Sequence, residues 1–201
     1  MAVISGGTTL INNGALDSGV ATGKLILLST QTASSSASIS FTSNIDSTYD
    51  SYIFKIINVH PSADGADFTF NMSSDGGSNY NVTKTSSQYN ARHSEDDGTA
   101  TLSYIDNNDL AQGTGFQIIG DGVGGSNDEC GCGTLQIFKP SDTSFIKHFT
   151  CTFQNYRTND NSYNVYSAGY GNTSSAIDAV QFKFSGGNID SGIIKMYGVK
   201  S

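Results

Sequence analysis

Hydrophobic and polar side chains alternate along much of this chain with a period of two residues. In residues 67–73, Phe68, Phe70 and Met72 alternate with Thr, Asn and Ser side chains, and residues 37–42 show the same alternation. A period of two places every second side chain on one face of a β-strand. No window has the i, i+3, i+4, i+7 spacing of an amphipathic helix. The pattern predicts an all-β protein in which Phe68, Phe70 and Met72 face inward and their polar neighbours face outward.

Short strands separated by turn signals are predicted throughout the chain after residue 23. They cover residues 24–31, 37–42, 52–59, 67–73, 101–105, 116–120, 133–139, 145–153, 163–168, 179–184 and 193–197. The run 52–59 is almost continuously apolar, which predicts a central strand buried on both faces, and Pro61 ends it. Roughly ten antiparallel strands in one domain favour an antiparallel β-sandwich of the jelly-roll type.

Two longer features are predicted between residues 67 and 113. Residues 74–78 have the Gly-rich composition of a tight turn, and Tyr80 and Val82 resume the alternation, so residues 67–84 are expected to form a hairpin. From residue 86 to residue 113 the pattern weakens and acidic side chains accumulate. This segment is interpreted as a surface excursion that carries one short strand near residues 101–105.

The first 23 residues differ in composition from the rest. They are rich in Gly, Ser, Thr and Asn, their first cation is Lys24, and their apolar clusters are short. They are interpreted as an arm that serves for attachment, with one extra edge strand as the alternative, followed by a single domain at residues 24–201. No secretory signal is expected, because no cation precedes Lys24 and Gly and Asn interrupt the apolar residues. No membrane-spanning segment is expected either, because no apolar run approaches about 18 residues.

The net negative charge of the chain argues against one class of binding partner. The 201 residues carry 10 Lys and Arg against 18 Asp and Glu, a formal charge of −8, and only 14% of the side chains are charged. A nucleic-acid binder needs clustered cations to contact phosphates, so this composition argues against one. The polarity comes instead from Ser, Thr, Asn and Gly, which suits strands and turns.

Three cysteines and one histidine form the best candidate for a metal site. Cys130, Cys132, His148 and Cys151 offer three thiols and an imidazole, a set that zinc accepts. However, His148 and Cys151 are an odd number of positions apart on one predicted strand and therefore point to opposite faces. We expect a buried Cys151 and two loop thiols rather than a metal, with a disulfide from Cys151 to Cys130 or Cys132 as the alternative.

Other motifs carry little chemistry. Gly120, Gly122 and Gly125 have the G-x-G-x-x-G spacing, but no helix is predicted after them to receive a phosphate. The acidic stretches 95–97 and 106–109 offer calcium ligands without the loop pattern of a calcium site, so bound calcium remains an open alternative.

No catalytic constellation is recognisable either. The sequence has no G-x-S-x-G motif, and His60, His93 and His148 are isolated from one another. A pair of carboxylates for glycoside cleavage would depend on the fold, and nothing in the sequence marks one. We therefore expect no enzymatic activity, no catalytic residue, no metal ligand and no cofactor.

Tyrosine side chains are the candidates for a shallow sugar-binding surface. Tyrosine rings stack on the apolar faces of sugars, and five tyrosines near predicted turns are candidate platforms. They are Tyr80, Tyr89, Tyr104, Tyr156 and Tyr163. Tyrosine is also a common strand residue, so a purely structural role is the alternative for each.

Several segments together resemble a family of small structural proteins of marine tailed bacteriophages. These segments are residues 41–65, 72–85, 107–117, 138–149 and 166–199. The resemblance covers nearly all of the chain after residue 24, and it brings no active-site or binding residues. It implies a β-rich component of the virion that assembles symmetrically with itself, a trimer being favoured, and with other virion proteins.

Residue pattern and resemblance lead to one functional prediction. It is a non-enzymatic virion structural protein, assembled in the host cytoplasm, foremost a tail fibre, tail appendage or adhesin that contributes to host attachment and contacts a host surface glycan. The alternatives are a capsid decoration protein and a stand-alone carbohydrate-binding module. No nucleic acid and no membrane insertion are expected.

Overall fold

A computed structural model of the chain describes residues 3–5, 8–12, 15–16 and 25–200. The all-β prediction is confirmed, since 60% of the structure is strand and none of it is helix. No described helix is therefore long and apolar enough to cross a membrane. The strands are β1 (Val3–Ser5), β2 (Thr8–Asn12), β3 (Ala15–Leu16), β4 (Leu25–Ser36), β5 (Ile39–Phe41), β6 (Ser51–Pro61), β7 (Ala66–Ser73), β8 (Lys84–Ser94), β9 (Ala100–Tyr104), β10 (Gln117–Val123), β11 (Gly131–Phe138), β12 (Lys147–Arg157), β13 (Asn161–Gly171), β14 (Ala179–Phe184) and β15 (Ile189–Val199).

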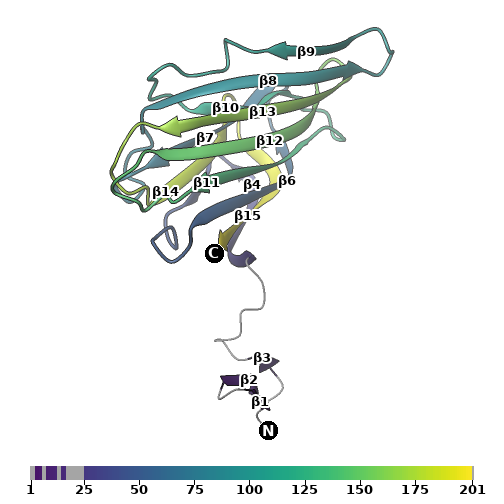
Figure 1. Cartoon of the computed structure of the whole chain (residues 1–201). Helices are drawn as coiled ribbons and strands as arrows, with labels where there is room; N and C mark the ends of the chain where they lie inside the picture. Colours follow the sequence, from purple (N-terminus) through teal and green to yellow (C-terminus); the bar gives the residue numbers. More distant parts are fainter. Residues whose placement is uncertain (1–2, 6–7, 13–14, 17–24, 201) are drawn as a thin grey trace.

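Twelve of these strands form one antiparallel sheet that curls into a nearly closed, barrel-like shape (Figure 1). Its main path runs β4-β15-β6-β11-β12-β10-β7-β14-β5, and β13, β8 and β9 continue outward from the other side of β12. The link between β12 and β10 is a single pair, Val123 opposite Arg157. The four strands β10, β7, β14 and β5 therefore need side-chain packing to hold them against the rest.

Aromatic rings supply that packing. Phe68 on β7 stacks on Phe153 of β12 with ring centroids 5.6 Å apart, and Phe182 on β14 lies 5.4 Å from Phe54 of β6. All four rings are fully buried. Burying such a side chain contributes about 1.5–3 kcal/mol, so these rings are a main source of stability. The inward orientation predicted for Phe68, Phe70 and Met72 is confirmed.

The interior is polar where β8 contributes to it. Gln88 Nε2 donates to Ser167 Oγ at 2.7 Å and to the Ile118 carbonyl at 2.8 Å, and Asn90 donates to the Tyr163 hydroxyl. Gln88 and Asn90 are both buried. The predicted surface excursion is thus wrong for β8, because its inward positions carry amides instead of apolar side chains. The short strand near residues 101–105 is confirmed as β9.

The predicted hairpin at residues 67–84 is also wrong. The turn forms, with Gly76 and Gly77 at positive φ, but β7 pairs with β10 and β14 and not with the segment after the turn. That segment instead crosses the outer face of β7, where Asn71 Nδ2 donates to the carbonyl oxygens of Tyr80 and Thr114. Both faces of β7 are consequently buried, so the expected exposure of its Thr, Asn and Ser side chains is wrong as well.

Strand β6 departs from its prediction in the opposite direction, because one of its faces is exposed. Tyr52, Phe54 and Ile56 are buried, whereas Lys55 and Ile57 on the other face are exposed. The prediction of a strand buried on both faces is therefore wrong, because the structure covers only the inner face of β6. Pro61 is the last residue of the strand, as predicted.

Residues of the expected N-terminal arm form a small antiparallel sheet of their own. Its order is β1-β2-β3, and it pairs with no strand of the twelve-stranded sheet among the described residues. The alternative of one extra edge strand is not what these residues form. The remainder of the arm, including the expected boundary at residues 23–24, lies outside the described residues.

Glycines make room for the central ring of the core. A Cβ added at Gly120 or at Gly131 would overlap Cε1 of Phe153. We expect Gly131→Ala to lower the free energy of unfolding by about 1–3 kcal/mol, the usual cost of overpacking a core. Urea denaturation followed by circular dichroism measures this. Gly186→Ala is the matched control, since no atom lies within 4 Å of its added Cβ, and it should shift stability by less than about 0.5 kcal/mol. Equal losses for the two variants would contradict this account.

Lys84 is a buried cation at the start of β8. Its side chain is inaccessible to solvent, and Nζ donates to the carbonyl oxygen of Val82 at 2.8 Å and to Asn71 Oδ1. Burial disfavours the charged form and lowers the pKa of Lys84 from 10.5 to about 7. Between these two pKa values the unfolded chain binds more protons at this site than the folded chain does. The contribution of Lys84 to stability therefore rises with pH in that range.

We expect this group to give wild-type protein a gain in the free energy of unfolding between about pH 7 and about pH 9. Lys84→Met should abolish this gain, because methionine fills a similar volume without a titrating group. The exposed Lys55→Met should preserve it. Urea titrations at the two pH values measure the effect, and identical pH slopes for wild type and Lys84→Met would show that Lys84 is not its source.

Candidate functional site

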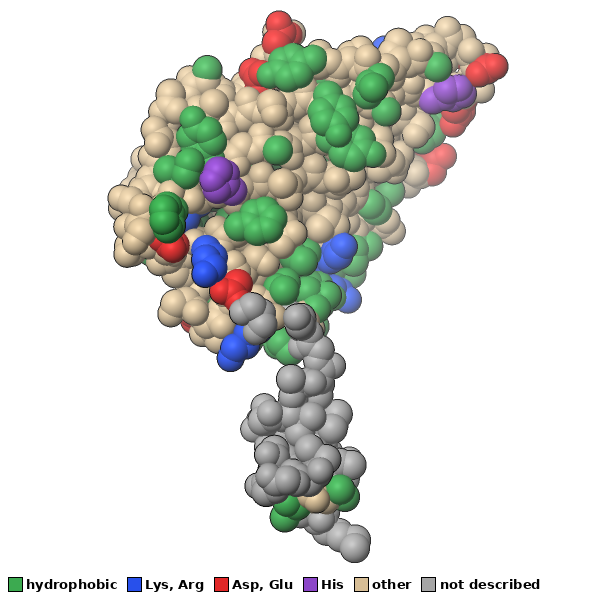
Figure 2. Space-filling model, in the orientation of Figure 1, with side chains coloured by type: hydrophobic (Ala, Val, Ile, Leu, Met, Phe, Trp, Pro, Cys, Tyr) green, Lys and Arg blue, Asp and Glu red, His purple; other side chains and the backbone are tan. Residues whose placement is uncertain are grey.

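The largest hollow described on this protein is a trough on the outer face of β8, β13 and β12. It consists of two adjoining cavities of about 450 Å³ and about 210 Å³ that share Ser87, Thr150 and Ala168. Figure 2 shows this face, where hydrophobic side chains lie among uncharged polar ones and charged side chains lie toward the margins. We call it the tyrosine trough. Its outward-facing side chains are Thr85, Ser87, Tyr89, His148, Thr150, Thr152, Tyr166, Ala168 and Tyr170.

Strand register brings these side chains together. Residues directly opposite one another in antiparallel strands lie on the same face, so each register row places one side chain from each strand beside the next. Three rows across β8, β13 and β12 build the trough. They are Tyr89–Tyr166–Thr152, Ser87–Ala168–Thr150 and Thr85–Tyr170–His148. The trough therefore depends on long-range pairing and not on any local motif.

Aromatic rings stand at both ends of the trough and a small side chain lies between them. At one end the rings of Tyr89 and Tyr166 stack, with centroids 4.9 Å apart and planes inclined by 9°. At the other end His148 meets Tyr170 edge to face at 6.2 Å. Ala168 separates the two ends along β13. The result is a hollow with ring surfaces at its ends and the small side chains of Ser87, Ala168 and Thr150 between them.

The polar side chains of the trough are hydroxyls and the imidazole of His148. Ser87 and Thr150 line the middle, Thr152 lies beside the stacked tyrosines, and the Tyr166 hydroxyl accepts a hydrogen bond from Asn164 Nδ2 at 3.2 Å. No Asp, Glu, Lys or Arg lines either cavity. Such a surface can stack on flat apolar faces and exchange hydrogen bonds, and it offers no carboxylate, ammonium or guanidinium group to attract an ion.

The five tyrosines predicted as platforms for sugar rings lie in different environments. Tyr89 and Tyr104 are exposed by 46% and 60% on the outer face, where they lie opposite each other in the register of β8 and β9. Tyr163 is buried, and burial raises the pKa of its hydroxyl. Tyr80 and Tyr156 are half-buried outside the trough.

The sequence analysis did not single out Tyr166 or Tyr170, and it did not place His148 beside Tyr170. Tyr166, Ala168 and Tyr170 are separated by two residues each, so their shared face was readable from the alternation alone. The partner strands were not readable in the same way, because register between distant strands is set by the fold. Ring pairs such as Tyr89 with Tyr166 therefore appear only in the structure.

The cysteines and His148 do not gather into a zinc site. Cys151 is buried on the inner face of β12, whereas His148 is exposed on the outer face, which confirms the parity argument. All three cysteines are free. Cys132 Sγ donates to Asn58 Oδ1 at 3.2 Å, and Cys130 Sγ lies 3.9 Å from the same oxygen. No disulfide from Cys151 to either of them is present.

This arrangement predicts two classes of thiol. Cys130 and Cys132 are half-exposed and should react with Ellman's reagent in the native protein, while Cys151 should react only after unfolding. Burial raises the pKa of both the Cys151 and the Cys130 thiols, so Cys130 should react slowly. Cys132→Ser should remove the faster native phase. Three thiols reacting at one rate in native protein would contradict the burial of Cys151.

Some acidic side chains cap turns, and one forms a partly buried ion pair. Asp96 Oδ1 accepts hydrogen bonds from Ser94 Oγ and Gly98 N, which lower the pKa of Asp96 and shape the turn between β8 and β9. Asp121 pairs with Arg157 at 3.1 Å in a partly buried position. In the part of the chain that the structure describes, no three His, Cys, Asp or Glu side chains lie close enough to hold a metal ion.

Asp67 and Asp121 are carboxylates that lie close enough to influence each other. Burial raises the pKa of Asp67, the Gly122 amide opposes this by donating a hydrogen bond, and the negative charge of Asp121 raises it further. Neither residue lines the trough or the other cavities described here. Of the histidines, His60 contacts the Ser126 carbonyl and His93 pairs with Asp97. These contacts hold loops and turns in place.

The segment with the G-x-G-x-x-G spacing continues as strand. Gly120 and Gly122 lie within β10, and the chain then enters β11 without a helix. The expectation that no helix follows these glycines is confirmed. Gly125 donates its amide to Asp64 Oδ1 at 2.9 Å, so its loop is satisfied within the protein.

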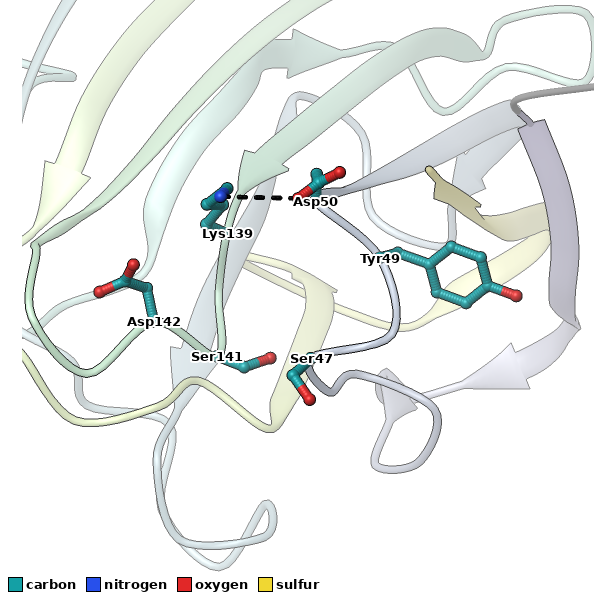
Figure 3. Close-up of a pocket in the computed structure, with 6 residues that line it drawn as sticks. All are labelled: Ser47, Tyr49, Asp50, Lys139, Ser141 and Asp142. Carbon is teal, nitrogen blue, oxygen red and sulfur yellow. Dashed lines mark ion pairs between the residues drawn. The ribbon is translucent and has the colours of Figure 1, made fainter. Parts of the chain in front are cut away.

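A smaller cavity of about 180 Å³ lies where the loop before β6 meets the loop after β11 (Figure 3). Lys139 Nζ is 3.6 Å from Asp50 Oδ1, and the Lys139 amide donates to the Asp50 carbonyl at 2.7 Å. The ring of Tyr49 points away from this pair (Figure 3). The contacts join two loops, and an exposed ion pair of this kind contributes at most about 1 kcal/mol.

Comparison with protein-family models, with curated proteins and with solved structures finds no match to this chain. No family is assigned on that basis. The tyrosine trough is therefore judged by its own geometry, which joins ring surfaces at two ends with neutral hydroxyl groups between them.

Proposed function

We propose that this protein is a non-enzymatic structural component of a tailed-bacteriophage particle, foremost a tail fibre, tail appendage or adhesin that contributes to host attachment. The resemblance of its segments to phage structural proteins supports the assignment. The observation that carries the attachment role is the tyrosine trough, an aromatic hollow without Asp, Glu, Lys or Arg on the outer face of the sheet. We also propose that the curled sheet is a jelly-roll-like sandwich, supported by the ring contacts that join β7 and β14 to β12 and β6.

The physical character of the fold suits a particle component. A virion protein must stay folded outside cells over a range of salt concentrations. This interior is held by buried aromatic rings and by hydrogen bonds between neutral groups such as Gln88 and Ser167. Only 14% of the side chains are charged, so few surface ion pairs exist for salt to weaken.

Assembly with copies of itself and with other virion proteins belongs to the same proposal, a trimer being favoured and the host cytoplasm being the place of assembly. Among the residues that the structure describes, β4 pairs with β15 alone, so its other edge carries no described strand. Leu25 and Leu27 on that strand are exposed by 48% and 51%. An open edge with apolar side chains supports self-association.

We expect the protein in purified phage particles at a fixed ratio to the tail proteins. Mass spectrometry of the particles measures the ratio, and cryo-electron microscopy or gold-labelled antibody locates the protein. A position on the tail supports the adhesin assignment, and a position on the head supports the alternative, a capsid decoration protein. Absence from washed particles would overturn the virion role.

A stand-alone carbohydrate-binding module is the second candidate function, and the tyrosine trough favours it specifically. Such a module would bind sugar without being part of a particle. Neither candidate requires turnover, and we expect no release of reducing ends when host polysaccharide is incubated with the protein.

A further inference from the structure

We propose that the tyrosine trough binds a neutral oligosaccharide. The choice of ligand class comes from the geometry and charge of the trough itself. Only the identification of the sugar as a host surface glycan rests on the proposed function. The ligand is inferred from three features of the site, namely ring surfaces, hydroxyl groups and the absence of Asp, Glu, Lys and Arg side chains.

The first feature is ring surface at a hollow. A pyranose ring has apolar faces made of C–H groups and a rim of hydroxyl groups, so it needs an aromatic surface beside polar side chains. The stacked rings of Tyr89 and Tyr166 form one rigid wall, and Tyr170 with His148 forms another. Rings held by stacking and by strand register lose little conformational freedom when a ligand binds, which favours affinity.

The second feature is the neutral polar floor. Ser87 and Thr150 flank Ala168 in the middle of the trough, so their hydroxyls lie between the two aromatic ends. A hydroxyl can donate and accept, which suits the hydroxyl groups of a sugar. A purely apolar partner would instead leave these hydroxyls buried without hydrogen bonds, at a cost for each of them.

The third feature is charge. The lining holds no Lys or Arg, and the chain carries a formal charge of −8. An acidic polysaccharide would meet repulsion from the net negative charge of the chain and find no Lys or Arg side chain to pair with. Charge complementarity therefore selects a neutral sugar over uronic-acid, sialic-acid or phosphate-bearing glycans.

The length of the trough indicates an oligosaccharide. Tyr166 and Tyr170 are four residues apart on β13, which corresponds to about 13 Å at the rise of a β-strand. The larger cavity alone, about 450 Å³, is in the size range of ligand pockets. One monosaccharide cannot contact both aromatic ends, so a short linear chain of sugars fits best.

The test uses full-length protein on an array that carries neutral hexose and N-acetylhexosamine oligosaccharides beside acidic ones. We expect saturable binding to one or more neutral oligosaccharides, weaker binding to the corresponding monosaccharide, and no gain from uronic or sialic acid. Calorimetry with the best oligosaccharide then gives the dissociation constant. A blank array, or binding confined to acidic glycans, would overturn the proposal.

Three variants assign the binding to the trough. Tyr166→Ala should weaken binding about tenfold or more by removing one ring of the stacked wall. Ala168→Gln should block the middle of the trough while every wild-type ring remains, so it tests the site independently of lost packing. Tyr197→Ala is the matched control, because this half-buried tyrosine lies on β15, away from the trough, and should leave the dissociation constant unchanged.

Folding and assembly are measured alongside binding. Circular dichroism and thermal melts show whether each variant is folded, and sedimentation velocity gives its oligomeric state. Sugar binding that survives in both folded trough variants would overturn the assignment to this site. A change of oligomeric state in these variants without sugar binding would identify the trough as an interface between copies. Absence of the protein from phage particles would overturn the virion role without bearing on sugar binding. The virion role and the sugar site can therefore be disproved separately.

Discussion

The fold depends on aromatic rings that pack inside one curled sheet, and above all on the space that glycines leave for Phe153. Gly120 and Gly131 lie against this ring, and any Cβ at either position would overlap it. The ring in turn stacks on Phe68 of β7. Because one residue pair joins β12 to β10, this packing, more than the hydrogen bonds of the ladder, holds the four strands from β10 to β5 against the others.

A second, polar part of the interior allows the sheet to widen beyond β13. Gln88 and Asn90 on β8 reach inward to hydroxyl groups of Ser167 and Tyr163, so β8 is held without an apolar side chain at those two positions. With β8 in place, the outer faces of β8, β13 and β12 form a continuous surface. The tyrosine trough exists on that surface because Ala168 is small and its neighbours on both sides are rings.

The alternation of side chains was enough to locate most strands but not to pair them. Strand β14 has the predicted bounds, and its Phe182 is buried as its period of two requires. Strand β8 escaped detection because buried amides look like surface residues in a sequence. The turn at Gly76 and Gly77 was correctly placed, yet it reverses the chain without forming a hairpin, since β10 and β14 occupy both edges of β7.

The sequence alone determined that this protein is built of strands, that its surface is sparsely charged, and that Cys151 and His148 lie on opposite faces. Side-chain parity and composition are local properties, and they survive any arrangement of the strands. The tertiary structure decided which face of β6 is covered and which distant tyrosines meet. Tyr89 stacks on Tyr166 only because β8 pairs with β13 in one register, and that register is set by packing across the whole interior.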